Sequence, residues 1–227
     1  NPPFLDAMAA EIRAALPDRH VHLVLENEEN DAARLRDGGF DAQWNDDFHN
    51  VLHVILTGER EGYYEGFADR ATERLARCLA EGFIYQGENG RGAPSGHLSP
   101  GHFVTFLQNH DQVGNRAMGE RLLGLTDAAR LRAATALQLL CPQVPLLFMG
   151  ETEGSTTPFL FFTDFHDELA DAVRNGRRKE FAHFAAFSDP KAREAIPDPN
   201  DEGTFARSTP EPGPDAAEWR SFYADLL

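Results

Sequence analysis

The sequence predicts an α/β fold in which helices cover a parallel sheet. Short apolar runs alternate with segments whose apolar residues recur every three or four positions, as strands and helices do when they alternate. Polar residues follow each run, and the ends of parallel strands share one edge of a sheet. Four strands are predicted, whereas a (β/α)8 barrel needs eight. A doubly wound open sheet is the alternative, since it binds its ligand at the same edge.

The first half of the chain predicts two strands and three helices. Helical spacing covers residues 5–16, and Pro17 ends that helix. The first strand covers residues 21–25 and stops at Glu26, and the second covers residues 40–44. The residues that can cap the next helix are Asn45, Asp46 and Asp47. The apolar faces of the next two helices are Phe48, Val51, Leu52 and Ile55 in one and Ala71, Leu75, Cys78 and Leu79 in the other.

The second half predicts two further strands after a glycine-rich loop. Residues 87–101 are too irregular for a packed element, and loops of that length are usually functional or mobile. The third strand covers residues 102–107, and the fourth covers residues 144–149 and ends at Glu151. The helix between these strands is predicted to bury Ala133, Ala136, Leu137 and Leu140.

Composition excludes several classes of partner. The net charge of −16 argues against nucleic acid and anionic membranes, and it suits a neutral, hydroxyl-rich substrate. The sequence has no apolar run of membrane-spanning length and no signal-peptide pattern, so a cytoplasmic location is expected. Cys78 and Cys141 are predicted to be buried free thiols. Neither a zinc-like histidine spacing nor a phosphate-binding glycine loop occurs, so no metal or cofactor is expected.

Two strand ends carry residues suited to cleavage of a glycosidic bond. That reaction needs one carboxylic acid to protonate the leaving oxygen and one carboxylate to trap or stabilise the oxocarbenium-like centre. Glu26 suits the acid, because an apolar strand would deliver it, partly buried, to the sheet edge. Asp111 beside His110 offers a fixed negative charge and partners for sugar hydroxyls. Each feature alone also fits a solvated loop, and only their combination favours a site.

Longer strings resemble the α-amylase superfamily. Asn109-His110-Asp111 resembles the motif that ends the seventh barrel strand there, and longer strings resemble the maltooligosyltrehalose trehalohydrolase branch. These strings cover residues 106–116 (FLQNHDQVGNR), 41–49 (DAQWNDDFH), 158–164 (PFLFFTD), 176–181 (GRRKEF) and 196–199 (IPDP). They stand in the family's order, and the resemblance covers nearly the whole chain.

The resemblance implies that residues 1–227 are part of a (β/α)8 barrel, with about strands five to eight. It implies hydrolysis of the α-1,4 bond next to the terminal trehalose of maltooligosyl trehalose, with retention of configuration. Glu26 would be the general acid/base, and Asp111 would stabilise the transition state. The residues implied to bind the α-glucan are His110, Asn109, Gln112, Trp44, Asn45, Asp46, Asp47 and His49.

Two departures from the family pattern affect the expected activity. The family's nucleophile lies in an Arg-x-Asp-x-x-His string after the fourth strand, and this sequence has no such string. Asp6 lies in the first helical pattern and is interpreted as a helix charge. The family usually has Glu and Trp where Thr152 and Glu153 stand.

The chain alone is therefore predicted to be inactive and to need either the first half of the barrel or a second copy as partner. The alternatives are a non-catalytic α-glucan-binding fragment or another superfamily enzyme, such as a glycogen-branching relative. Trp44 is interpreted as either a sugar platform or a core residue. Residues 159–162 are interpreted as packing, and residues 176–181 as a solvated helix end.

Overall fold

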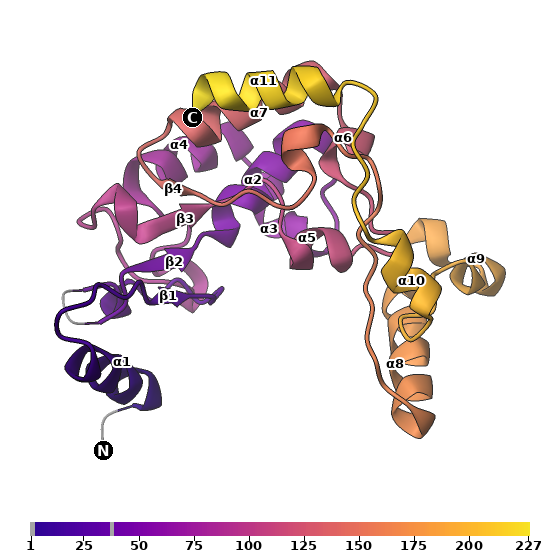
Figure 1. The fold of residues 1–227 in the computed structure, drawn as a ribbon, viewed down its shortest axis with the longest axis horizontal. Helices are drawn as coiled ribbons and strands as arrows, with labels where there is room; N and C mark the ends of the chain where they lie inside the picture. Colours follow the sequence, from indigo (N-terminus) through magenta and orange to yellow (C-terminus); the bar gives the residue numbers. More distant parts are fainter. Residues whose placement is uncertain (1–2, 37–38) are drawn as a thin grey trace. The chain divides into compact units, whose positions relative to one another are not determined.

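A computed structural model describes residues 3–36 and 39–227 of the chain (Figure 1). The chain forms two compact units. Unit 1 consists of Asn1–Leu107 and Ala129–Leu146, and unit 2 consists of Gln108–Ala128 and Leu147–Leu227.

Unit 1 contains a parallel sheet of four strands that lie side by side in chain order (Figure 1). The strands are β1 (Val24–Leu25), β2 (Ala42–Trp44), β3 (Phe103–Thr105) and β4 (Val144–Pro145). In the register, Val24 lies opposite Ala42, Gln43 opposite Phe103, and Val104 opposite Val144. A doubly wound sheet reverses its strand order at a switch point, whereas this order runs one way, so the sheet fits part of an α/β barrel.

One helix of unit 1 precedes the sheet, and the others lie between β2 and β3 or between β3 and β4. They are α1 (Phe4–Ala15), α2 (Asp46–Thr57), α3 (Glu65–Ala68), α4 (Ala71–Glu81) and α7 (Ala128–Leu140). Four 3-10 turns lie among the described residues of this unit: η1 (Ala32–Arg34), η2 (Gly62–Tyr64), η3 (Glu88–Gly90) and η4 (Pro100–His102). The glycine-rich segment 87–101 thus contains only short turns, as predicted.

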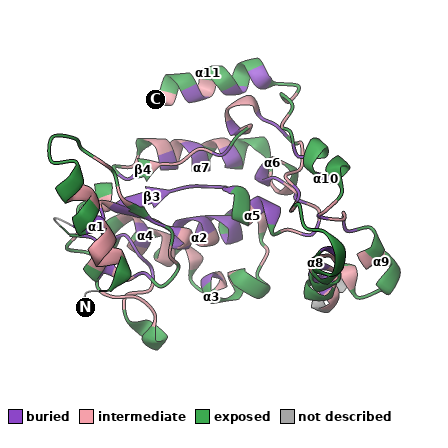
Figure 2. Ribbon diagram, turned by 60° about the horizontal axis from the view of Figure 1, so that its bottom comes forward, coloured by how far each residue is buried: buried purple, intermediate pink, exposed green. Residues whose placement is uncertain are grey.

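The core of unit 1 lies between the sheet and its helices, where β3 and α2 carry many buried residues (Figure 2). Phe83 packs edge-on against Phe103, with ring centroids 5.0 Å apart. Gly82 permits this contact, because a Cβ there would lie 2.0 Å from the Phe103 ring, and its φ of +90° favours glycine. Of the predicted α2 face, Ile55 is 38% exposed and the other three residues are buried.

The predicted apolar face of α7 is wrong. Ala133 and Leu140 are exposed, while the buried residues include Thr135 and Gln138. The physical reason is that Gln138 donates from Nε2 to the carbonyl oxygens of Thr105 (2.9 Å) and Leu146 (3.0 Å). The buried residues of α7 are Leu131, Ala134, Thr135 and Gln138, so its buried face is offset from the predicted one and includes two polar residues.

Unit 2 is helical among its described residues. Its helices are α5 (His110–Gly114), α6 (Leu122–Leu125), α8 (Asp167–Glu180), α9 (Pro190–Glu194), α10 (Glu202–Arg207) and α11 (Ala216–Leu226). Its 3-10 turns are η5 (Glu151–Glu153), η6 (Phe181–His183) and η7 (Ala185–Phe187). The predicted packing role of residues 159–162 is confirmed, since Phe159 contacts both Phe148 and Phe162 edge-on.

The interpretation of residues 176–181 as a solvated helix end is confirmed in part, since Gly176, Lys179 and Glu180 are exposed whereas Arg177 and Phe181 are buried. The Arg177 side chain is buried and donates from Nη2 to the carbonyl oxygens of Gly114 (2.7 Å) and Arg116 (2.9 Å). Its guanidinium also lies over the Phe161 ring, 4.5 Å from the centroid. The guanidinium can be buried here because it donates hydrogen bonds to two carbonyl oxygens and makes a cation–π contact with an aromatic ring.

The other predictions on elements are confirmed in part. Every strand is shorter than predicted, and α1 ends before Pro17 as expected. Asp6 lies in the first turn of α1, 3.6 Å from Arg36. Both cysteines are free thiols, with Cys78 buried and Cys141 half-buried. Within residues 3–36 and 39–227, no helix is long and apolar enough to cross a membrane.

Candidate active site

The loop after β1 carries Glu26, whose side chain is exposed. The expectation of a partly buried acid at this position is therefore wrong for this structure. The reason is its place in the sheet, because β1 is the edge strand and pairs with β2 alone among the described strands. The next residues are held inward: the Gln43 side chain donates to the Asn27 carbonyl oxygen (2.7 Å), and the Asn30 amide donates to Asp47 (2.9 Å).

The residues at the end of β2 mainly contact other residues of unit 1. Trp44 is half-buried, and its ring lies edge-on to Phe106 at 5.6 Å. Asn45 is only 1% exposed, and its amide donates to the Gly82 carbonyl oxygen (2.8 Å). Its side chain thus does not cap α2, which corrects that expectation, while its predicted sugar contact stays a prediction.

The buried carboxyl in unit 1 belongs to Asp47, at the start of α2. Its Oδ2 accepts from the Asn30 amide and from the backbone N–H groups of Ile84 (2.8 Å) and Tyr85 (3.2 Å), and Arg91 lies 3.4 Å from Oδ1. Burial raises the pKa of this carboxyl, although Arg91 and the three donors favour its charged form. Asp47 is 0% exposed, and its predicted contact with sugar stays a prediction.

Two other predicted sugar contacts of unit 1 differ in burial. His49 is 3% exposed, and its Nδ1 donates to the Leu107 carbonyl oxygen (2.6 Å), so it supports the chain that follows β3. Its predicted sugar contact stays a prediction. Asp46 is half-buried, and its proposed role stays a prediction.

In unit 2, the segment Asn109-His110-Asp111 begins helix α5. The Asn109 side chain is 2% exposed and caps the helix, since its Oδ1 accepts from the N–H groups of Asp111 (2.9 Å) and Gln112 (3.0 Å). The predicted role of Asn109 as a sugar contact stays a prediction. His110 and Asp111 are exposed, with His110 Nε2 3.5 Å from Asp111 Oδ1, and Gln112 is half-buried. The cap therefore fixes the first turn of α5 in an orientation that leaves Asp111 exposed to solvent.

Glu151 is the functional candidate that sequence reasoning left out of its site. Its Oε1 accepts from Gln108 Nε2 (2.9 Å), while Gln108 Oε1 accepts from the N–H of Leu122 (2.7 Å). Burial raises the pKa of Glu151 to about 7, against the opposing effects of Gln108, the Phe148 N–H and Arg121. Its position after a predicted strand was the available signal, but burial was not visible in the sequence.

The altered loop Thr152-Glu153 packs within unit 2. Glu153 lies 2.9 Å from Arg220 of α11, and the next residue, Gly154, lies under Trp219. A Cβ on Gly154 would come within 2.2 Å of that indole. The loop is thus fixed by α11, and a sugar contact from it stays untested.

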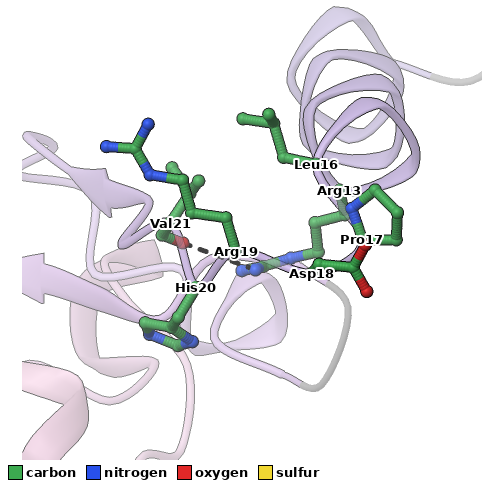
Figure 3. Close-up of a pocket in the computed structure, with 7 residues that line it drawn as sticks. All are labelled: Arg13, Leu16, Pro17, Asp18, Arg19, His20 and Val21. Carbon is green, nitrogen blue, oxygen red and sulfur yellow. Dashed lines mark hydrogen bonds between the residues drawn. The ribbon is translucent and has the colours of Figure 1, made fainter.

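A separate hollow of about 420 Å³ lies in unit 1 between α1 and residues 17–21 (Figure 3). Arg13 extends into it and donates to the Val21 carbonyl oxygen (3.4 Å). Because Val21 precedes β1, this hollow lies at the amino end of that strand, away from the end that carries Glu26. It holds no predicted site residue.

Comparisons with known proteins give one consistent result. The search of family models returned no match for this chain. The chain is 42% identical over 199 residues to the malto-oligosyltrehalose trehalohydrolase of Deinococcus radiodurans, which covers 82% of this chain and 32% of that protein. It is 38% identical over 244 residues to the enzyme of that name from Arthrobacter ramosus, covering 98% and 40%.

A solved structure of a candidate alpha amylase from Salmonella typhimurium matches with a TM-score of 0.91 and 45% identity. The match covers 100% of this chain and 41% of that one. The chain thus spans about a third to two-fifths of the length of these similar proteins.

Proposed function

The chain belongs to the malto-oligosyltrehalose trehalohydrolase family, and on that premise we propose that it forms part of a glycoside hydrolase that releases trehalose from maltooligosyl trehalose. The observation that carries the proposal is its identity of 36–45% with relatives that all bear this name. The exposed Glu26 and Asp111, each shortly after a strand, are consistent with it.

We assign the two exposed carboxylates different roles. Glu26 donates a proton to the glycosidic oxygen as the bond to the leaving sugar breaks, and it then takes a proton from the water that resolves the covalent intermediate. Asp111 stabilises the positive charge that develops at the sugar, and His110 binds a hydroxyl group there. Gln112, Trp44 and Asp46 remain proposed contacts of the α-glucan.

The strand assignment is part of the same proposal. We assign β1 to β4 to strands five to eight of the barrel, since their parallel order along the chain is that of consecutive barrel strands. The nucleophile then belongs to the end of strand four, for which this chain offers no Arg-x-Asp-x-x-His string. We therefore propose that the 227-residue chain alone does not turn over substrate.

The decisive experiment measures trehalose release from maltooligosyl trehalose by the chain alone and by the chain mixed with the first half of the barrel. We expect release only from the mixture, and release about a thousandfold slower after Glu26→Gln. Turnover by the chain alone, abolished by Glu26→Gln, would contradict the missing nucleophile. A mixture that forms the complex but releases no trehalose would contradict the function.

A second candidate is a general α-amylase activity, because the solved structure at 45% identity bears that name. The same mixture discriminates the two. A preference for glucans that end in trehalose over plain maltooligosaccharides supports the first function, and equal rates support the second.

A further inference from the structure

The loop after β1 carries an inference that rests on the proposed function. We propose that Asp47 is a positioning residue for Glu26 and acts through Asn30, which holds that loop against the start of α2. In this role Asp47 does not touch the sugar, although it directs the group that reacts with the sugar.

The first support is the number of segments that meet at this one carboxyl. Oδ2 of Asp47 accepts hydrogen bonds from the Asn30 side chain and from two successive backbone N–H groups, at Ile84 and Tyr85. A buried carboxylate with three donors has one favourable orientation, so it fixes the loop segment relative to α2 and to residues 84–85.

The second support is that the loop is held at both of its ends. Near Glu26, the Gln43 side chain donates to the Asn27 carbonyl oxygen at 2.7 Å. Between these anchors, the Glu29 N–H donates to Asn27 Oδ1 at 2.9 Å, which closes a local turn. Asn30 itself has a φ of +57°, a conformation that asparagine tolerates better than most residues do. These hydrogen bonds therefore hold residues 27–30 in place, and Glu26 is the residue that directly precedes this segment.

The third support comes from the glycine-rich segment, which encloses the Asn30–Asp47 pair. Arg91 lies 3.4 Å from Asp47 Oδ1 and stacks over the Tyr85 ring at 4.5 Å. The Ala93 N–H donates to the Asn30 carbonyl oxygen at 3.1 Å. Between them, a Cβ on Gly92 would lie 2.1 Å from the Tyr85 carbonyl oxygen. The irregular segment thus contacts both members of the pair, through Arg91 at Asp47 and through Ala93 at Asn30.

Two observations favour positioning over stabilisation alone. The Glu26 side chain is exposed and lies beyond an edge strand of two residues, so the strand gives it little support. Among the described residues, the hydrogen bonds that tie 27–30 to the rest of unit 1 come from Gln43, Asp47 and Ala93. A reacting group displaced by about 1 Å can lose about a hundredfold in rate.

The test compares Asn30→Gly, Asp47→Asn and the control Asp69→Asn. Glycine keeps the left-handed backbone at position 30 and removes only the side chain that donates to Asp47. Asp69 is an exposed carboxylate of the same unit, so its variant makes the same chemical change outside the anchors. Each variant is measured in the chain mixed with the first half of the barrel, for kcat and KM of trehalose release. Each is also measured in the chain alone, for amide hydrogen exchange at residues 27–30.

We expect Asn30→Gly and Asp47→Asn to lower kcat about tenfold to a hundredfold with KM within about twofold, and to speed exchange at residues 27–30. Asp69→Asn should match the unchanged chain. In a Glu26→Gln background, Asn30→Gly should cause no further loss of kcat, because it acts through Glu26.

Four results separate the outcomes. Faster exchange with unchanged kcat would overturn the positioning role, and so would a loss that multiplies fully with Glu26→Gln, since that indicates general damage. Unchanged exchange at residues 27–30 would show that Asp47 does not hold the loop. If the unsubstituted mixture releases no trehalose, the proposed function itself fails, and the exchange data still decide whether Asp47 holds the loop.

Discussion

Unit 1 and unit 2 each combine one exposed carboxylate with one buried carboxyl in segments that follow strands. In unit 1 these are Glu26 and Asp47, and in unit 2 they are Asp111 and Glu151. All four have the same position in the sequence pattern, so the pattern cannot tell a reacting group from a supporting one. Burial and the donors around each carboxyl make that distinction.

The two buried carboxyls also differ from each other. Asp47 has three hydrogen-bond donors on one oxygen and an arginine 3.4 Å from the other. Glu151 has the Gln108 amide and one backbone N–H, at 2.9 and 3.3 Å. Burial raises the pKa of both, and that of Glu151 reaches about 7. Glu151 has fewer hydrogen-bond donors to favour its charged form, and its carboxyl therefore changes protonation near neutral pH.

The largest expected effect is on the rate of trehalose release, and it distinguishes the exposed carboxylate Glu26 from the buried carboxyls. Glu26→Gln should lower the rate of trehalose release about a thousandfold, because it removes the proton donor. It should change the free energy of unfolding by less than about 0.5 kcal/mol, since the side chain is exposed. Kinetics of the mixture and urea unfolding of the chain measure the two. A large loss of stability with little loss of rate would instead indicate that Glu26 supports the fold and does not react with the sugar.

The next effect concerns pH and Glu151. Its pKa is about 7 in the folded state against an ordinary 4.5, so the folded state holds the proton more tightly between these values. The free energy of unfolding should therefore fall by about 3 kcal/mol as pH rises from 4.5 to above 7. Glu151→Gln should remove that slope, whereas the exposed Glu211→Gln should keep it. Urea unfolding across this pH range, at one chain concentration, is the measurement.

Removing the buried carboxyl of unit 1 should cost about 2 kcal/mol. Asp47→Ala leaves the N–H groups of Ile84 and Tyr85 and the Asn30 amide without their acceptor inside the protein. The matched change Asp69→Ala, at an exposed site, should cost less than about 0.5 kcal/mol. Equal midpoints of urea unfolding for the two variants would show that the Asp47 contacts add nothing.

The smallest effect tests the cap of α5. Asn109→Ala should lower the free energy of unfolding by about 1 kcal/mol, since its Oδ1 accepts from two N–H groups of the first turn. Asn109→Asp or Asn109→Ser retains an acceptor and should recover most of that loss. If the alanine variant is fully stable but binds maltooligosaccharide weakly, Asn109 is a sugar contact after all.

How far the sequence predicts this molecule differs between the fold and the site. Periodicity located α1, α2, α4 and the order of the strands, because these patterns reflect which faces are buried. It missed the buried face of α7, where Gln138 replaces apolar residues, and the burial of Arg177. Polar residues that satisfy strand and helix ends give no periodic signal.

For the site, the sequence predicted the segments but not the direction of each side chain. The apolar run of residues 21–25 located the end of β1, and the family strings located the end of β2 and the segment that begins α5. Within them, Asn45, Asp47 and Asn109 point inward to backbone groups, while Glu26 and Asp111 point outward. Neighbouring residues at a strand end or a helix cap point in different directions. A shift of one residue along the chain therefore changes a side chain that supports the fold into one that faces solvent and a ligand.

The double hydrogen bond of Gln138 has a consequence for the order of folding. Its Nε2 needs the carbonyl oxygens of Thr105 and Leu146, which come together only once β3 and β4 have paired. We therefore expect the bond to form late, after the rate-limiting step. Gln138→Ala should speed unfolding and leave the refolding rate unchanged in a denaturant-jump experiment, which is the signature of an interaction absent from the transition state. Slower refolding would instead place α7 and both strands in the folding nucleus.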